Sequence, residues 1–278
     1  MPMETRLMPS PREAAVLDTQ ELRDAFLLDE LFAAGEIRLV YTDLDRAVVG
    51  SAIPGASPLI LPTDDALKAE FFCQRRELGL LNLGGGGSVT VDGTVHRIAQ
   101  HDCLYIGRGS REVSFASDSA ATPAVYYLVS YPAHAEFPTV KATRADANRV
   151  ELGSRDEANE RTIFQYIHEN GIRSCQLVMG FTEFKPGGVW NTMPCHTHDR
   201  RSEVYCYFDL PAAHRVLHLM GQPQETRPLW VADREVVLSP PWSIHTGCGT
   251  ASYRFCWAMG GENQAFTDMD RVEISELR

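Results

Sequence analysis

The chain has 278 residues, of which 44% are hydrophobic and 23% are charged, a composition typical of globular proteins and not of disordered or fibrous ones. Its 26 Lys and Arg against 37 Asp and Glu give a formal net charge of −11, a sign that repels nucleic-acid backbones and anionic membranes. No apolar run approaches the ~18 residues that span a bilayer, and Met1–Arg6 lacks the apolar stretch of a secretory signal. We therefore expect a cytoplasmic protein that binds neither nucleic acids nor membranes.

The N-terminal part of the chain carries the signals of a short helix. Asp18 is a good N-cap residue and is followed three positions later by Glu21. Apolar residues then recur every three or four positions up to Leu31, and Gly35 can end the helix. The pattern predicts one short N-terminal helix that runs through Leu31.

From Ile37 onward the sequence consists of short runs of β-branched and aromatic residues, separated by Gly, Pro and Asp. Such runs with regular turn signals favour an all-β sandwich or barrel over alternating strands and helices. The clearest runs are IRLVYTD, ELGLLNL and SVTVDG in the first half and EVYCYFD, REVVLSP and ASYRFCWAMG in the second.

A polar stretch, residues 141–161, interrupts these runs and is predicted to be a linker. On each side of it a turn, a strand, a tight turn at Gly or Pro and another strand follow one another, at residues 102–113 and 233–246. We therefore expect two antiparallel β-barrel halves of similar build, residues 1–150 and residues 151–278. A charged tail closes the chain.

The segment around residue 196 concentrates groups that can bind a metal. His196 and His198 lie two apart, so on a strand their imidazoles point to the same side. A polar turn follows them, and a hairpin there would bring Glu203 back opposite the two histidines. A second proline-containing turn, Pro240–Ser243, introduces His245 at the start of another strand.

Three histidines and one carboxylate suit a divalent transition metal and leave a coordination position for water or substrate. The alternative reading, two neighbouring surface histidines with no common role, accounts for the first pair but not for the full pattern. The corresponding part of the first half has no H-x-H pair and no histidine after its turn. The sequence therefore predicts one metal ion per chain, bound in the second half.

The pattern H-x-H-x4-E followed by P-x4-H is similar to the two-part metal motif of the cupin superfamily, whose members are small antiparallel β-barrels. Longer strings along the whole chain resemble the family of 5-keto-4-deoxyuronate isomerases. The most specific of these strings are RRELGLLNLGGGGSVTVDG, NTMPCHTHDRRSEVY, SPPWSIHTG and MGGENQAFTDMD.

This resemblance implies a bicupin fold, a homohexamer and a zinc ion held by His196, His198, Glu203 and His245. It also implies the reaction of pectin and uronate breakdown in which the keto-uronate 5-dehydro-4-deoxy-D-glucuronate becomes 3-deoxy-D-glycero-2,5-hexodiulosonate. Zinc has no redox chemistry, which fits a ketol-isomerase.

An isomerisation through an enediolate needs a group that moves a proton from C2 to C1, and the alternative is a direct hydride shift. Glu262 and Tyr205 are the predicted catalytic residues, and Asp268, Asp270 and His218 are further candidates.

The substrate carboxylate calls for a cation, preferably the bidentate guanidinium of arginine. Arg161, Arg200 and Arg227 are the predicted substrate-binding residues, and Arg201 is a further candidate that the sequence does not rank below them.

Three rival readings share part of this evidence. A bicupin isomerase that acts on 5-deoxyglucuronate in inositol breakdown would have the same fold and ligand set. A non-catalytic metal- or sugar-binding cupin would keep the site without turnover. An iron dioxygenase would require oxygen uptake.

Overall fold

The structure is a computed structural model that describes residues 3–278. The chain forms two compact units, each built from several stretches of sequence. The first consists of the segment up to Arg6 with Glu30–Ala147 and Tyr166–Met179, and the second of Leu7–Asp29, Asn148–Gln165 and Gly180–Arg278. The domain boundary expected after residue 150 stays a prediction, because compactness does not by itself identify parts that fold independently.

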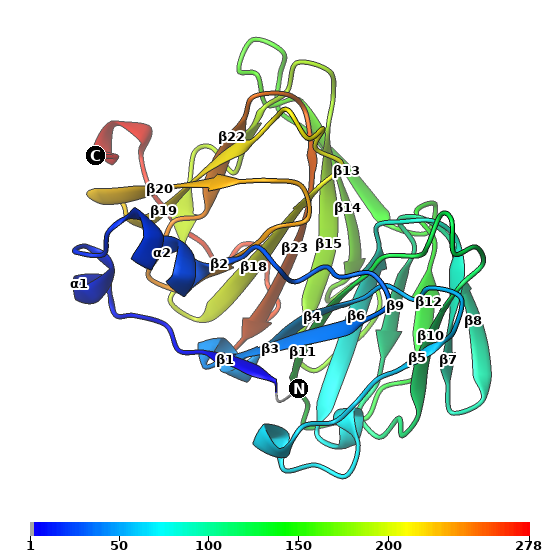
Figure 1. Cartoon of the computed structure of the whole chain (residues 1–278). Helices are drawn as coiled ribbons and strands as arrows, with labels where there is room; N and C mark the ends of the chain where they lie inside the picture. Colours follow the sequence, from blue (N-terminus) through cyan, green and yellow to red (C-terminus); the bar gives the residue numbers. More distant parts are fainter. Residues whose placement is uncertain (1–2) are drawn as a thin grey trace. The chain divides into compact units, whose positions relative to one another are not determined.

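The first unit contains a seven-stranded and a four-stranded sheet (Figure 1). Every pair of neighbouring strands in it is antiparallel except β1 and β3, which pair in parallel. The larger sheet has the order β1 (Glu4–Arg6), β3 (Ile37–Thr42), β4 (Val48–Ala52), β11 (Tyr126–Pro132), β6 (Arg76–Asn82), β9 (Cys103–Ile106) and β12 (Val140–Ala142). The smaller has the order β5 (Leu59–Ile60), β10 (Val113–Ser117), β7 (Gly87–Val91) and β8 (Thr94–Ile98). Three short 3-10 helices, Leu44–Arg46, Asp65–Leu67 and Phe72–Gln74, lie in the connections.

The second unit repeats this arrangement with a seven-stranded and a four-stranded sheet. Its larger sheet has the order β13 (Asn148–Leu152), β14 (Arg161–Ile167), β15 (Val178–Phe184), β23 (Arg254–Gly261), β18 (Arg201–Phe208), β21 (Val236–Ser239) and β2 (Leu27–Leu28). Its smaller sheet has the order β16 (Trp190–Asn191), β22 (Thr246–Gly249), β19 (Val216–Gln222) and β20 (Glu225–Val231). A short pair, β17 (His196–Thr197) with β24 (Asp270–Arg271), and a 3-10 helix, Ile274–Glu276, complete the unit.

The N-terminal helix is shorter than the sequence predicts. Asp18 caps helix α2 (Thr19–Phe26) and forms the expected capping box with Glu21, and a shorter helix, α1 (Pro11–Ala14), precedes it. The prediction that the helix reaches Leu31 is wrong, because Leu27 and Leu28 form β2 and pair with β21, where both side chains are buried. The apolar spacing suits either structure, and pairing with a sheet decides between them. None of the helices within residues 3–278 is long and apolar enough to cross a membrane.

The predicted linker, residues 141–161, contains two strands. One is β13, which pairs with β14 at the edge of the larger sheet of the second unit, and the other is the end of β12. Side chains of β13 are mostly exposed, so the strand lacks the apolar alternation that would mark it in the sequence. The predicted linker region thus includes a strand of the second unit, and its role as the boundary between two halves stays a prediction.

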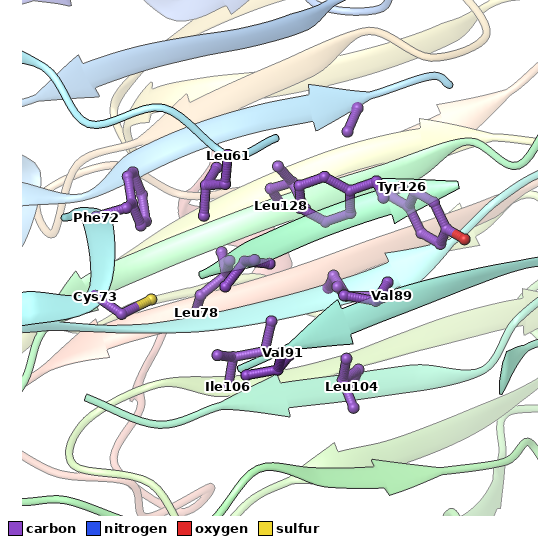
Figure 2. Close-up of a cluster of buried hydrophobic side chains, with 14 of the residues drawn as sticks. Leu61, Phe72, Cys73, Leu78, Val89, Val91, Leu104, Ile106, Tyr126 and Leu128 are labelled. Carbon is purple, nitrogen blue, oxygen red and sulfur yellow. The ribbon is translucent and has the colours of Figure 1, made fainter. Parts of the chain in front are cut away.

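The interior of the first unit is filled with apolar side chains (Figure 2). They come from both sheets, so the space between the sheets is a closed core that binding residues do not interrupt. Leu78, Leu104, Ile106, Val89 and Phe115 are among its members, and each is at most 1% exposed.

Glu77 is a fully buried charged residue of this unit and binds a separate stretch of chain. Its carboxylate accepts hydrogen bonds from the backbone N–H groups of Cys175, Gln176 and Leu177 at 2.7–2.9 Å and from the Tyr105 hydroxyl at 2.8 Å. Four donors satisfy the carboxylate, so a fully buried charge is tolerated here. The residue thereby anchors the segment Tyr166–Met179 within the first unit.

Replacing this carboxylate should cost stability. In Glu77→Ala the four donors lose their acceptor inside the protein, and at about 1–3 kcal/mol for each buried unpaired group we expect the unfolding free energy to fall by at least about 4 kcal/mol. Urea denaturation measures the change. Glu77→Gln, which keeps one acceptor oxygen, should lose less, and equal losses for the two variants would show that the hydrogen bonds are not the cause.

Candidate metal centre

Four side chains from three segments of the second unit converge on one point. His196 lies in β17, His198 precedes a turn at Asp199–Arg200, and Glu203 follows in β18. His245 comes directly before β22, after the turn that Pro240 and Pro241 begin. One metal-binding atom from each of the four residues lies within 4.8 Å of all the others. The structure thus brings together all four residues that the sequence predicts as ligands.

The individual distances are those of groups facing a common centre. Oε2 of Glu203 lies 3.1 Å from Nε2 of His198 and 3.0 Å from Nε2 of His245. Nε2 of His245 lies 3.0 Å from Nε2 of His196. Two ring nitrogens that face each other this closely need a shared proton or a shared cation between them, and three imidazoles with a carboxylate are a donor set for a divalent transition metal.

The connection between these residues differs from the hairpin that the sequence suggests. A backbone hydrogen bond of 3.4 Å from Arg201 N–H to the His198 carbonyl closes the turn. However, β17 pairs with β24 near the C-terminus, His196 opposite Arg271, and not with β18. The prediction of a paired hairpin is therefore wrong, although the turn does bring Glu203 back to the histidines.

The far nitrogens of two histidines are held by oxygen atoms. Nδ1–H of His198 donates to the backbone carbonyl of Arg201 at 2.8 Å, which directs Nε2 at the cluster. Nδ1 of His245 lies 3.4 Å from both the Ser239 hydroxyl and the Ser243 carbonyl. Such contacts fix the tautomer and the ring orientation of metal-binding histidines.

Burial and mutual charge shift the pKa values of this group. Burial, together with nearby His245, lowers the pKa of His196 to about 3, so this imidazole is neutral near pH 7. Burial acts in the same direction on His198, but the hydrogen bond and charge of Glu203 outweigh it and raise the pKa of His198. Burial would raise the pKa of Glu203, yet the adjacent His245 and His198 lower it well below its usual range. The carboxylate is therefore ionised and its negative charge favours a bound cation.

The corresponding place in the first unit holds an apolar residue. β6 and β18 occupy the same position in their sheets, and each begins with the second arginine of an Arg-Arg pair. The third residue of β18 is Glu203, whereas the third residue of β6 is Leu78, a member of the apolar core. The two units thus share a strand arrangement and differ in the side chain at this position, which is apolar in the first unit and a carboxylate in the second.

This contrast predicts one metal ion per chain. We expect elemental analysis of zinc-loaded protein to give one equivalent of zinc per chain. The first unit has the apolar side chain of Leu78 at the position where the second has the carboxylate of Glu203. His196→Ala should then bring the content below half an equivalent. Two equivalents in the wild-type protein, or one equivalent retained in the variant, would contradict the prediction.

Tyr205, one of the two predicted catalytic residues, lies beside the cluster. Its ring centroid is 5.5 Å from that of His245, and its hydroxyl is 3.0 Å from the Thr192 hydroxyl. Burial raises the pKa of Tyr205 well above its usual value, and the charge of Glu203 acts in the same direction. Near pH 7 this phenol is neutral and can donate a hydrogen bond.

A second layer of buried polar side chains lies next to Tyr205. The Tyr207 hydroxyl is 2.7 Å from Nδ1 of His218, whose ring centroid is 5.8 Å from that of Tyr205. Within the part of the chain that the structure describes, Nε2 of His218 and Oδ1 of Asn191 are buried without a hydrogen-bond partner. Burial lowers the pKa of His218 to about 3, so this residue is a neutral neighbour of the cluster.

The other predicted site residues lie in different surroundings. Glu262 is exposed, and its backbone N–H donates to the Arg200 carbonyl at 2.9 Å, beside the turn at Asp199–Arg200, which we call the metal-binding turn after the candidate site. Arg200 is ion-paired with Asp268 and, at 2.8 Å, with Asp270.

Arg161 and Arg227 differ in the use of their guanidinium groups. Arg227 donates to the carbonyl groups of Ala14, Ala15 and Leu17, so its guanidinium holds the N-terminal helical segment. Arg161 donates to the Asn159 carbonyl at 2.8 Å, and burial lowers the pKa of its guanidinium. Among the three predicted arginines, Arg161 has the fewest described side-chain hydrogen bonds and therefore the most donors left for a ligand.

Arg201 is the residue at this centre whose role the sequence does not indicate. It is 2% exposed, its carbonyl holds His198, and its guanidinium donates to the carbonyl groups of Ala265 and Asp268 at 2.8 and 3.1 Å. As a further candidate for the substrate carboxylate, Arg201 would reach a ligand only by leaving these carbonyl groups. The signal for its structural role is the repeated Arg-Arg pair, since Arg76 at the corresponding place in β6 is also buried and binds carbonyl groups.

Comparisons with known proteins agree with this geometry. The model of the KduI/IolB family matches residues 27–275. The chain belongs to this family. A curated relative from Formosa agariphila, 4-deoxy-L-threo-5-hexosulose-uronate ketol-isomerase, is 53% identical over 99% of this chain and 98% of its own length. A relative of the same name from Halalkalibacterium halodurans is 51% identical over 99% of this chain and all of its own length.

Solved structures with low sequence identity share the fold. An IolB-like protein from Salmonella typhimurium superimposes with a TM-score of 0.69, at 15% identity, over 89% of this chain and 96% of its own. The oxalate decarboxylase of Lactobacillus farciminis gives a TM-score of 0.58 at 11% identity, over 83% of this chain and 80% of its own. The all-β bicupin fold with a short N-terminal helix, expected from the sequence, is confirmed.

Proposed function

We propose that this KduI/IolB-family chain is a 4-deoxy-L-threo-5-hexosulose-uronate ketol-isomerase, an intramolecular oxidoreductase of pectin and uronate degradation. It would convert 5-dehydro-4-deoxy-D-glucuronate into 3-deoxy-D-glycero-2,5-hexodiulosonate. The observation that carries the proposal is the name shared by relatives about 50% identical over 99% of the chain. The compact set of three histidines and one carboxylate supports it, since it is a site suited to such chemistry.

We propose that His196, His198, Glu203 and His245 hold one zinc ion. The donor set fits zinc, because imidazole nitrogen and carboxylate oxygen are among its usual ligands and the facing ring nitrogens of His196 and His245 can share a cation. When bound, zinc supplies Lewis-acid stabilisation of the negative charge that develops on the oxygens at C1 and C2.

The proposed reaction moves one proton between carbon atoms and one between oxygen atoms. A base takes the proton from C2 of the aldehyde, the enediolate forms, and the proton returns to C1, while the proton of the C2 hydroxyl is transferred to the oxygen on C1. We assign the base to the exposed carboxylate of Glu262, beside the metal-binding turn. Tyr205, neutral and 5.5 Å from the His245 ring by centroid, would donate a hydrogen bond to a substrate oxygen.

For the substrate carboxylate, we rank Arg161 first among the predicted residues. Its guanidinium is partly exposed, and the only hydrogen bond described for it uses one donor. Arg200 would reach the substrate only by leaving Asp268 and Asp270, and Arg227 only by leaving the N-terminal carbonyl groups. Comparing KM for Arg161→Lys, Arg200→Lys and Arg227→Lys tests this order.

We further propose a cytoplasmic homohexamer in which residues 151–278 carry the catalytic site and residues 1–150 do not bind metal. The family resemblance supports the oligomer, and the apolar core of the first unit supports the division of roles. Analytical ultracentrifugation should give a species near six chain masses. A stable monomer at micromolar concentration would exclude the hexamer.

The test of the function is a direct assay. Zinc-loaded protein with 5-dehydro-4-deoxy-D-glucuronate should form the ketose reversibly, with no oxygen, nucleotide or reductant added. In deuterated water the enediolate route places deuterium on the carbon that was C1 of the substrate, whereas a direct hydride shift does not. Absence of ketol conversion by protein that contains zinc would exclude the proposed function.

A parallel assay separates the nearest alternative. An isomerase of inositol breakdown would prefer 5-deoxyglucuronate. The family that matches this chain carries a double name, KduI/IolB, so membership alone does not choose the substrate. We expect the uronate of pectin breakdown to give the higher kcat/KM. No turnover of either sugar would favour a non-catalytic binding protein, and oxygen uptake would indicate a dioxygenase.

A further inference from the structure

The last part of the chain lies against the segment that carries two of the four clustered residues. We call residues 262–272 the C-terminal strap. The Glu262 N–H donates to the Arg200 carbonyl at 2.9 Å, and the Val272 N–H donates to the Cys195 carbonyl at 3.1 Å. Between these two bonds β24 pairs with β17, which places Arg271 opposite His196. The strap therefore runs alongside the whole segment from Cys195 to Arg200.

Two arginines of the metal-binding turn add side-chain contacts to the strap. Arg200 is ion-paired with Asp268, and Arg201 donates to the carbonyl groups of Ala265 and Asp268 at 2.8 and 3.1 Å. Asn263 donates to the other carboxylate oxygen of Asp268, so this side chain is bound from two sides. Asp268 is the point at which the strap and the turn are joined most closely.

The backbone at the start of the strap is shaped for this approach. Gly261 has a φ of 151°, and a Cβ atom on it would lie 2.3 Å from the Arg200 carbonyl oxygen and 2.6 Å from Cα of Arg201. No side chain fits at that distance, so glycine permits the strap to leave β23 directly over the turn.

The far end of the strap is anchored by apolar contacts. Val272, Cys195 and Ile244 form a small buried cluster, against which Leu219 and Leu277 pack. Ile244 directly precedes His245, and Cys195 directly precedes His196. The same cluster thus fixes the backbone next to two of the clustered histidines.

We propose that the C-terminal strap holds the metal-binding turn in its ligating conformation, with Asp268 and Arg201 as positioning residues. Both act through other groups. The backbone carbonyl of Arg201 orients His198, and the carboxylate of Asp268 binds Arg200 and accepts a hydrogen bond from Asn263 of the strap. The inference rests on the proposed zinc site and adds that the site is preorganised by a segment that contributes none of the four clustered ligands. Preorganised ligands bind a metal more tightly, since less ordering remains to be done on binding.

The test compares Asp268→Asn with a matched variant, Glu183→Gln. Glu183 pairs with Arg254 in the same unit, and its side chain is 21% exposed, against 15% for that of Asp268. Zinc affinity of the metal-free full-length protein is measured by competition with a chelator of known affinity. We expect Asp268→Asn to raise the Kd for zinc about 10- to 100-fold, as for other residues that orient metal ligands. Glu183→Gln should leave this Kd within about twofold, because an ion pair remote from the ligands has no coupling to them.

A second variant, compared with Asp268→Asn, distinguishes the loss of ligand positioning from a folding defect. Arg200→Gln removes the same ion pair from its other side, and its effect on the zinc Kd should be non-additive with that of Asp268→Asn. At saturating zinc both variants should still bind one equivalent of zinc, because neither residue is one of the four clustered ligands. Thermal unfolding of the metal-free proteins reports general destabilisation separately.

Three outcomes are distinguishable. Failure of the wild-type protein to bind zinc would overturn the proposed function and the inference with it. Tight zinc binding by the wild type and equally tight binding by Asp268→Asn would overturn the inference alone. An equal loss of zinc affinity in Glu183→Gln would show that the effect is one of general stability, and would overturn it as well.

Discussion

His245→Ala is expected to lower both zinc content and isomerase activity while leaving the protein folded. Removing one of four ligands should weaken zinc binding by more than the about 10- to 100-fold that follows the loss of an outer contact. The metal's stabilisation of charge is worth several kcal/mol, so turnover should fall about 10³-fold. Zinc analysis after dialysis and the ketol assay measure the two effects.

The folded state should survive because other contacts hold this part of the barrel. His245 is fully buried, but outside the cluster its Nδ1 contacts only the Ser239 hydroxyl and the Ser243 carbonyl among the described residues, both at 3.4 Å, the weak end of hydrogen bonding. His214→Ala is the control, since that histidine lies in a surface turn and contacts Thr250 at 3.0 Å. If His245→Ala loses its cooperative unfolding transition, the site is structural; if it keeps wild-type zinc affinity, His245 is not a ligand.

Tyr205→Phe is expected to lower kcat about 10²-fold without changing zinc affinity. The substitution removes only the hydroxyl, which burial keeps neutral and which we assign as a hydrogen-bond donor to the substrate. One such donor to a developing oxyanion contributes about 10²–10³ to kcat. Because the ring remains beside His245, the metal ligands keep their packing.

Tyr207→Phe is the matched control for this variant. Tyr207 lies two residues further along β18, on the same face, and its hydroxyl contacts His218, not the clustered ligands. We expect its loss to cost stability and to leave kcat within about fivefold, the effect of a structural hydrogen bond of about 1 kcal/mol. If both variants lose the same activity, the Tyr205 hydroxyl has no special role. If zinc affinity falls in Tyr205→Phe, the residue supports the metal instead.

Much of the candidate centre could be predicted from local sequence. Eight positions contain two histidines separated by one residue, a polar turn and a following glutamate. A segment this short has few ways to arrange these side chains. The prolines before His245 restrict the backbone in the same way. The all-β fold was likewise predictable, because turn residues and β-branched runs follow one another along most of the chain. Asp18 and Glu21 marked the start of the helix for the same local reason.

Other features depended on contacts between distant residues. Leu27 and Leu28 continue the apolar spacing of a helix and become a strand only because β21 offers an edge to pair with. Glu77 reads as an ordinary strand residue, and only the fold brings three backbone N–H groups from Cys175–Leu177 to it. Leu78 and Glu203 occupy equivalent places in the two units. This equivalence becomes visible only from the order of the strands in each sheet.

The charged C-terminal residues show most clearly what local sequence does not predict. From sequence they are a polar tail, since Glu262, Asp268 and Asp270 carry no periodic apolar pattern. In the folded chain the strap pairs with β17 and binds Arg200 and Arg201, so its charges satisfy partners about seventy residues away. Local sequence was enough to show which residue types could bind a metal and that most of the chain forms strands, because these follow from side-chain chemistry and local backbone preference. The tertiary structure alone decided which segments hold those residues in place, because hydrogen bonding across long separations leaves no local pattern.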